Sequence, residues 1–251
     1  MKTDILIQAR TSSSRFPEKV IQKPRGMTIL ELLIKRVKQA KFIDDIIIVT
    51  SSDSSDDIIE KITINNGVKI YRGSLENVLD RYYKACQTYK TKVIVRITGD
   101  CPLIDPQLID LIVEKFKFLK VDYLSNTIIP KFPDGQDVEV FSFHALKTAW
   151  ANATLNSERE HVTPFIYKNS SFYGQKLFNA VNYDNEEGDY SKIRMTVDYK
   201  EDFELIKALI EKGGTNLSWK SFVEIIENND LEKVNIIYKR NQGYLKSLEN
   251  D

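Results

Sequence analysis

The sequence of 251 residues predicts an α/β protein: a single domain with a mainly parallel central sheet and helices on both faces. Two observations lead to this class. Short apolar runs alternate with helical patterns through the first half of the chain, and several runs are continuous, as in strands buried on both faces. In addition, no linker, low-complexity tract or internal repeat divides the chain.

Four strand–helix units are expected in the first half. The expected strands are 4–9, 45–51, 68–73 and 92–100, and the expected helices are 28–40, 54–67, 74–89 and 105–119. In the first helix, Ile29, Leu32, Leu33 and Val37 recur at helical spacing. The second has a serine cap and a glycine stop, and the fourth opens with Asp-Pro. Such repeated units place ligands at the carboxyl ends of the strands.

The pattern changes after about residue 121. The expected strands are 122–126, 135–143, which alternates in part as an antiparallel or edge strand would, and 191–198; the expected helices are 144–155, 158–169 and 199–213. Pro164 should start, end or kink a helix. The tail from residue 217 is expected to be helical and to pack on the outside, with its basic stretch a solvated helix end. We expect one domain over 1–251 with an inserted arm at about 142–190.

Composition limits the kinds of partner. Thirty-six basic residues balance thirty-six acidic ones, so no overall field favours nucleic acid or an anionic membrane, and any anion site must be local. Two cysteines are too few for a disulfide framework. No apolar run approaches the roughly 18 residues that span a bilayer, and the short N-terminal apolar segment is unlike a signal peptide. We therefore expect a cytoplasmic protein that binds neither nucleic acid nor membrane.

A cationic loop follows the first expected strand. Arg10, Arg15 and Lys19 surround Ser12, Ser13 and Ser14 at a strand end that should face the ligand crevice. Guanidinium and ammonium groups bind phosphate oxygens, and successive serines add hydroxyls and backbone amides. The chain has neither G-x-x-x-x-G-K-[ST] nor G-x-G-x-x-G. On charge alone, a solvated surface loop is an equally good explanation.

Two aspartates end other expected strands. Asp100 follows an apolar run and a glycine, and Asp198 ends a strand just before a helix. Each aspartate alone fits a helix N-cap better than a ligand. Carboxylates facing one crevice beside a cationic loop are, however, what Mg²⁺ requires when it bridges a protein and a triphosphate. The combination predicts a metal–nucleotide site.

Several ordered blocks of the sequence resemble one protein family. The blocks are IQARTSSSRFPEKVI, DDIIIVTSS, VKIYRGSLENVLDRYY, VIVRITGDCPLIDP, FPDGQDVEVFSFHAL, EREHVTPFIY and TVDYKEDFELI. Over about residues 3–210 they resemble the cytidylyltransferase-like family, most closely its spore coat polysaccharide biosynthesis protein F type. The synthetases of CMP-3-deoxy-manno-octulosonate and of CMP-sialic-acid-like sugars are more distant.

The resemblance implies a nucleotidyltransferase fold, akin to that of nucleotide-diphospho-sugar transferases, and a set of site residues. Arg10, Lys19 and Asp100 would be catalytic, and Asp100 and Asp198 would bind Mg²⁺. The nucleoside triphosphate, most often CTP, would contact Ala9, Arg10, Ser12, Ser13, Ser14, Arg15, Lys19, Thr50, Ser51, Ser52, Asp53, Arg72, Gly73, Ser74, Asp80, Arg81 and Gly99. The resemblance also implies a homodimer formed through the arm.

The acceptor and the base stay open. Relatives that activate 3-deoxy-octulosonate carry Gln-Gly-Asp-Glu-Pro, whereas residues 98–102 here read TGDCP. This difference argues against a classical sugar-acid pocket and for a sugar phosphate, and the acceptor stays open between a sugar, a sugar acid and a sugar phosphate. Some relatives use GTP in place of CTP. The segments FPDGQDVEVF and EREHVTP are the expected acceptor region, with Asp134, Gln136, Asp137, Glu139, Arg159 and His161 as candidate contacts. His161 alone reads more readily as structural, and Ser157 with Glu160 reads equally well as a capping box.

Two other functional classes compete with this interpretation. Glycosyltransferases that use nucleotide-sugars share the architecture, but many carry a D-x-D metal motif, which this chain lacks. A non-catalytic nucleotide-binding domain should have lost its arginine, lysine or aspartate set, and here all are present. The sequence therefore favours a Mg²⁺-dependent nucleotidyltransferase of surface polysaccharide or glycan synthesis.

Overall fold

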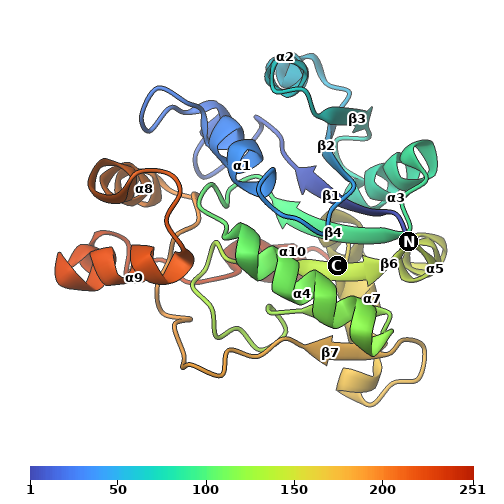
Figure 1. The fold of residues 1–251 in the computed structure, drawn as a ribbon. Coiled ribbons are helices and arrows are strands. Elements are labelled where there is room, and N and C mark those ends of the chain that lie inside the picture. Colours follow the sequence, from blue (N-terminus) through green and yellow to red (C-terminus); the bar gives the residue numbers. More distant parts are fainter.

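The computed structural model describes residues 1–251 and contains one seven-stranded sheet in the order β3-β2-β1-β4-β6-β5-β7. The strands are β1 Thr3–Gln8, β2 Asp45–Ser51, β3 Lys69–Gly73, β4 Val93–Thr98, β5 Tyr123–Ser125, β6 Glu139–Ser142 and β7 Ala180–Asn182. β1 to β4 are parallel, β6 runs antiparallel to β4 and β5, and β7 is parallel to β5. Figure 1 shows the sheet from β3 at the top to β7 at the bottom. The predicted mainly parallel sheet is confirmed.

Helices cover both faces of the sheet (Figure 1). One face carries α1 Ile29–Val37, α2 Asp57–Asn65, α4 Pro106–Leu119, α8 Lys200–Gly213 and α9 Trp219–Asn228; the other carries α3 Val78–Tyr89, α5 Phe143–Asn152, α6 Asn156–His161 and α7 Pro164–Lys168. The remaining helix is α10 Gln242–Leu248, and the 3-10 turns are η1 Lys19–Ile21, η2 Ser54–Asp56, η3 Ser171–Tyr173 and η4 Leu231–Val234. None of the helices combines the length and apolarity that a bilayer crossing requires.

Alternation along the central strands supplies two apolar cores. Ile5 and Ile7 of β1 point to the face of α1 and α4, whereas Leu6 points to the face of α3 and α5. The predicted Asp-Pro start of the fourth helix is confirmed, because Asp105 caps α4. The predicted serine cap of the second helix is wrong, because Asp53 caps the turn η2 and Asp56 precedes α2. At the start of α1, Thr28 and Glu31 form a capping box. Burial on both faces therefore holds the carboxyl ends of β1 and β4 in fixed positions beside each other.

The second half differs from the sequence prediction in four places. The expected helix 158–169 is divided into α6 and α7, because Val162 has φ +71° and Pro164 starts α7. Residues 191–198 do not form a strand: Arg194 makes one isolated bridge with Asp134, because the segment crosses the strand ends rather than joining the sheet. β6 is antiparallel as expected, but it is shorter than 135–143 and lies inside the sheet, so the edge-strand alternative is wrong. Residues 142–190, the expected arm, contribute the edge strand β7 to the sheet, and the sequence pattern did not predict this strand.

Candidate active site

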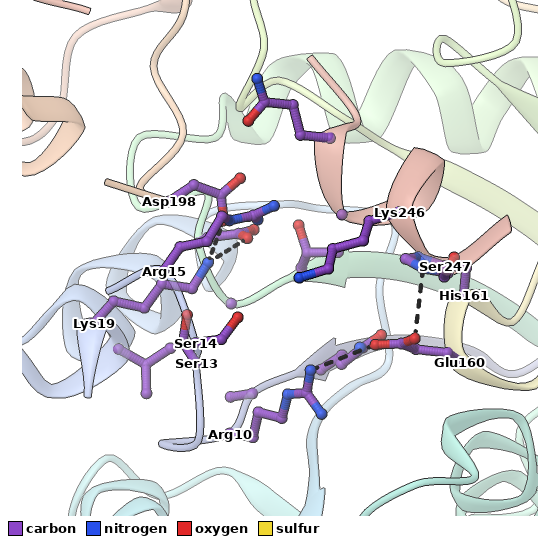
Figure 2. Close-up of a pocket in the computed structure, with 18 of the residues that line it drawn as sticks. Arg10, Ser13, Ser14, Arg15, Lys19, Glu160, His161, Asp198, Lys246 and Ser247 are labelled. Atoms are coloured by element: carbon purple, nitrogen blue, oxygen red, sulfur yellow. Dashed lines mark hydrogen bonds and ion pairs between the residues drawn. The ribbon is translucent and has the colours of Figure 1, made fainter. Parts of the chain in front are cut away.

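A cavity of about 600 Å³ lies at the carboxyl ends of β1 and β4 (Figure 2). Its lining includes the predicted residues Ala9, Arg10, Ser13, Ser14, Arg15, Lys19, Gly99, Asp100, His161 and Asp198. Gly99 lets the two strand ends approach, because a Cβ there would lie 2.8 Å from the carbonyl oxygen of Gln8. The structure therefore brings the cationic loop, Asp100 after β4 and Asp198 before α8 to one place.

A buried carboxylate, that of Asp56, hydrogen-bonds the loop after β1. Asp56 accepts hydrogen bonds from the Thr11 backbone N–H and hydroxyl, both at 2.8 Å. It also accepts hydrogen bonds from the hydroxyls of Thr50 and Ser51 at the end of β2. Asp56 is fully buried, so this network fixes the loop against the neighbouring strand end.

Lys19 lies between Asp100 and Asp198. Its Nζ is 2.8 Å from Asp100 Oδ2 and 2.7 Å from Asp198 Oδ1. Burial alone would lower the pKa of Lys19, but the negative charges of Asp100 and Asp198 outweigh burial and raise that pKa. Burial would likewise raise the pKa of Asp100, yet the Lys19 charge holds it well below its usual range. Lys19 and Asp100 are therefore both charged at neutral pH.

Asp198 is fixed by three cations and a buried network. Its Oδ1 contacts Lys19 and also Arg15, the latter at 2.6 Å, and its Oδ2 contacts Arg194 at 3.3 Å. Arg194 is itself held by Asp202, which also accepts the backbone N–H groups of Asp198 and Tyr199 at the start of α8. The turn that precedes α8 thereby sets where the Asp198 carboxylate points.

The donor chemistry of this pair suits a hard divalent cation. Two carboxylates from separate segments converge on one positive charge, at present the Lys19 ammonium. No group of three or more histidine, cysteine, aspartate or glutamate side chains is arranged to hold a metal ion. Mg²⁺ commonly takes only one or two protein carboxylates and completes its shell with phosphate oxygens and water. Asp100 and Asp198 therefore fit a metal that arrives with a phosphate ligand.

A second cavity, of about 340 Å³, shares a wall with the first. The residues that line both are Arg15, Arg96, Thr98, Asp100, His161, Asp198, Gln242 and Gly243. The second cavity is also lined by Asp134, Asp137 and Glu139, three of the predicted acceptor contacts. Each of these carboxylates has an arginine partner: Arg194 at 2.6 Å for Asp134, and closer pairs of Asp137 with Arg240 and of Glu139 with Arg96.

A glycine and a histidine shape the wall of the second cavity. Gly135 has φ +103°, and a Cβ there would lie 2.6 Å from the Met195 backbone, so only glycine fits between the two segments. Burial and the nearby charge of Arg96 lower the pKa of His161 to about 4, so its imidazole is neutral at pH 7. The buried Nε2 of His161 has no hydrogen-bond partner within the chain.

Many predicted nucleotide contacts lie outside both cavities. Those residues are Ser12, Thr50, Ser51, Ser52, Asp53, Arg72, Gly73, Ser74, Asp80 and Arg81. Arg72 instead pairs with Asp57 and Glu60, and Asp80 accepts a hydrogen bond from the indole N–H of Trp150. Arg81 is fully buried below the loop, and none of its guanidinium nitrogens has a partner. Burial lowers the pKa of Arg81.

Two predicted acceptor contacts also lie elsewhere. Gln136 is fully buried, where its side-chain amide accepts from the Asp105 N–H and donates to the Leu103 carbonyl. Arg159 hydrogen-bonds the Ala153 carbonyl on the outside of α6. The Ser157–Glu160 capping box is wrong, because Ser157 binds Asp251 and Glu158 caps the helix by accepting the Leu155 N–H.

Sequence reasoning missed three groups at the site. Arg96 lines both cavities, whereas Arg194 lines neither of them and contacts Asp198 from behind. Both arginines are charged residues in apolar stretches that end in an aspartate, and that interruption was a usable signal. The third group comes from α10 and the residues that flank it, namely Asn241, Gln242, Gly243, Tyr244, Lys246, Ser247 and Asn250. The expectation that the tail is a solvated helix end on the outside is therefore wrong, because α10 forms one wall of the first cavity.

Comparisons with known proteins agree with this geometry. A family model described as cytidylyltransferase matches residues 5–240. The uncharacterized protein MJ1063 of Methanocaldococcus jannaschii is 39% identical over 232 residues, which cover 91% of this chain and 92% of that protein. The spore coat polysaccharide biosynthesis protein SpsF of Bacillus subtilis is 34% identical over 231 residues, with coverages of 89% and 93%.

A solved structure gives the same result. A cytidylyltransferase from Leptospira borgpetersenii serovar Hardjo-bovis superposes with a TM-score of 0.88 at 36% identity, covering 94% of this chain and 98% of that one. These similarities favour nucleotidyl transfer over the glycosyltransferase and non-catalytic alternatives. The chain therefore belongs to the cytidylyltransferase family and is a nucleotidyltransferase.

Proposed function

We propose that this enzyme transfers the cytidylyl group of CTP to an oxygen of a sugar, a sugar acid or a sugar phosphate and releases pyrophosphate. The convergence of the Arg10–Lys19 loop with Asp100 and Asp198 carries the proposal. It joins cationic phosphate ligands and carboxylates at the strand ends where an α/β sheet binds nucleotides. The family match supports CTP as the nucleotide.

In the proposed reaction the acceptor oxygen forms a bond to the α-phosphorus, and the bond from that phosphorus to the pyrophosphate oxygen breaks. Little covalent work falls to the protein, so its contribution is positioning and neutralisation of charge. Arg10 and Arg15 would hold the phosphate oxygens from the loop. Lys19 would exchange a carboxylate partner for a phosphate oxygen when the nucleotide enters, which stabilises the charge of the leaving pyrophosphate.

Asp100 and Asp198 would hold Mg²⁺ in this proposal. The bound ion would supply charge neutralisation at the phosphates and a template for in-line displacement. The chain's own part is to keep Asp100 ionised and to direct both carboxylates. The Lys19 charge that lowers the pKa of Asp100 and the Arg194–Asp202 network behind Asp198 provide this.

The second cavity would take the acceptor. Its carboxylates already have arginine partners, so its hydrogen-bonding capacity comes largely from hydroxyl groups, among them Thr163, Tyr167 and Tyr244. A lining of this kind suits a hydroxyl-rich molecule such as a sugar. Any anionic group on the acceptor would face Arg15 and Arg96, which line both cavities.

The biological setting follows from the relative and from the substrate. SpsF of Bacillus subtilis carries a spore coat polysaccharide name, and by analogy we place this enzyme in surface polysaccharide or glycan synthesis. CTP is an intracellular substrate, so we place the enzyme in the cytoplasm.

We further propose a homodimer through the arm, since Phe172, Tyr173 and Leu177 are exposed there. Light scattering that gives a monomer mass at working concentration would remove the dimer.

A thermal-shift panel tests the proposed nucleotide. CTP, GTP, UTP and ATP are compared at millimolar concentration, each with and without Mg²⁺. Ligands that bind only the folded state raise its melting temperature, by an amount corresponding to about 2.7 kcal/mol at 100 times Kd. We expect the largest rise with CTP and a clear dependence on Mg²⁺. A selective rise with GTP would replace CTP in the proposal, and no rise with any of the four would overturn it.

A further inference from the structure

Contacts at both of its ends hold the C-terminal helix α10 against the first cavity, where it forms part of the wall. Before the helix, Arg240 pairs with Asp137 and donates to the Phe132 carbonyl at 3.0 Å. After it, Asp251 Oδ1 accepts the Ser157 N–H at 2.7 Å. In between, Tyr244 packs edge-on against His161 with ring centroids 5.0 Å apart. Contacts at both ends and in the middle give α10 a defined position over the site.

This helix carries a cation into the cavity. Figure 2 shows Lys246 reaching from α10 into the space between the Arg15–Asp198 pair and Arg10. The side chain approaches from the side opposite the loop after β1. Residues 241–251 lie beyond the part of the chain that the family model matches, so Lys246 is an addition to the matched site.

The charges that line the cavity single out Lys246. Its other cations all have carboxylate partners: Arg10 pairs with Glu160 at 3.5 Å, Arg15 and Lys19 pair with Asp198, Lys19 also pairs with Asp100, and Arg96 pairs with Glu139. Lys246 forms no ion pair and donates no side-chain hydrogen bond within the chain. His161 is neutral. Lys246 is therefore the cation in this cavity that is free to meet an anion.

We infer that Lys246 is a further nucleotide-binding residue, which contacts the phosphate groups of the nucleotide held by the Arg10–Lys19 loop. The inference rests on the proposed function, because it takes that nucleotide as the ligand. A triphosphate would then lie between cations of the loop on one side and Lys246 on the other. Such an ammonium–phosphate contact is charge-assisted, so it depends on the positive charge and not on the shape of the side chain.

Calorimetric titration of four proteins tests this role. Wild type, Lys246→Met, Lys246→Arg and Lys233→Met are titrated with CTP and with pyrophosphate in the presence of Mg²⁺. We expect Lys246→Met to raise the Kd of both ligands about tenfold, the size of one modest charge-assisted hydrogen bond. Lys246→Arg should stay within about twofold of wild type, because it keeps the charge. Lys233 is exposed and pairs only with Asp230, so Lys233→Met should bind as wild type.

The outcomes separate this inference from the proposed function. If wild type binds CTP and Lys246→Met binds it equally well, the inference is wrong and the proposed function stands. If Lys246→Arg is as weak as Lys246→Met, the side chain acts through packing of α10 and the phosphate contact is refuted. Wild type that binds neither CTP nor pyrophosphate overturns both. Lys246 is exposed, so the melting temperatures of its variants should match wild type and exclude loss of folding.

Discussion

Asp100→Asn is expected to lower turnover by at least about 10³-fold while the protein stays folded. The Asp100 carboxylate after β4 pairs with Lys19 and would bind the proposed metal. The asparagine side chain has the same shape, but it lacks the negative charge and has an NH₂ group in place of one oxygen. Pyrophosphate release in the presence of CTP, Mg²⁺ and an acceptor measures the loss. An Asp100→Asn enzyme that keeps Mg²⁺-dependent activity would contradict the role assigned to this residue.

The stability of Asp100→Asn should change little in comparison. Lys19 keeps Asp198 at 2.7 Å, so the ammonium is not left without a partner. We expect the free energy of unfolding to fall by about 1–3 kcal/mol, the range for one lost hydrogen bond to a charged group. Asp230→Asn is a matched control, because Asp230 is exposed and lines neither cavity. Loss of activity with a native-like melting transition would assign Asp100 to chemistry and not to folding.

Lys19→Met is expected to lose both activity and stability. It removes the only ammonium between Asp100 and Asp198 and leaves two carboxylates facing each other. Removing one member of a fully buried ion pair costs about 3–5 kcal/mol; here the carboxylates are 22% and 17% exposed, which reduces the expected loss of unfolding free energy to about 2–4 kcal/mol. Urea unfolding with Lys233→Met as control measures it. Turnover should fall at least about 10²-fold.

Acid and Mg²⁺ should both partly rescue Lys19→Met. In wild type, Lys19 holds the pKa of Asp100 below its usual value, so this contribution to stability is present above the unfolded pKa of about 3.8 and is lost as the pH falls through the folded pKa. Without Lys19, burial raises the pKa of Asp100 instead, so protonation of Asp100 should reduce the loss of stability of the variant as the pH is lowered. Mg²⁺ should raise its melting temperature by pairing with the freed carboxylates. A stability gap to wild type that is independent of both pH and Mg²⁺ would contradict this reading of the pair.

Local sequence predicted the residues that sit at strand ends. Arg10 and Asp100 each follow an apolar run, and a parallel sheet brings such positions to one edge whatever the remaining contacts are. Lys19 lies further along the loop that begins at Arg10. The apolar runs also predicted the first four strands, because strands buried on both faces need no knowledge of their partners.

The parts that sequence reasoning missed depend on distant partners. Residues 191–198 have a strand-like composition, but the backbone makes only one isolated bridge. Arg194 instead pairs with Asp134, 60 positions away, and Asp198 pairs with Lys19, 179 positions away. Thr50 and Ser51 looked available to a ligand, yet their hydroxyls are committed to Asp56. The tail gave no local sign that Arg240 would meet Asp137 and so direct α10 over the cavity.

The most direct test of the proposed site is a crystal structure with Mn²⁺ and a CTP analogue whose α–β bridge cannot be cleaved. We expect anomalous density for Mn²⁺ against Asp100 and Asp198, the triphosphate against the Arg10–Arg15 loop, and Lys19 moved from at least one carboxylate onto a phosphate oxygen. A nucleotide bound elsewhere, or Lys19 still between the two aspartates with Mn²⁺ at another place, would contradict the proposed site.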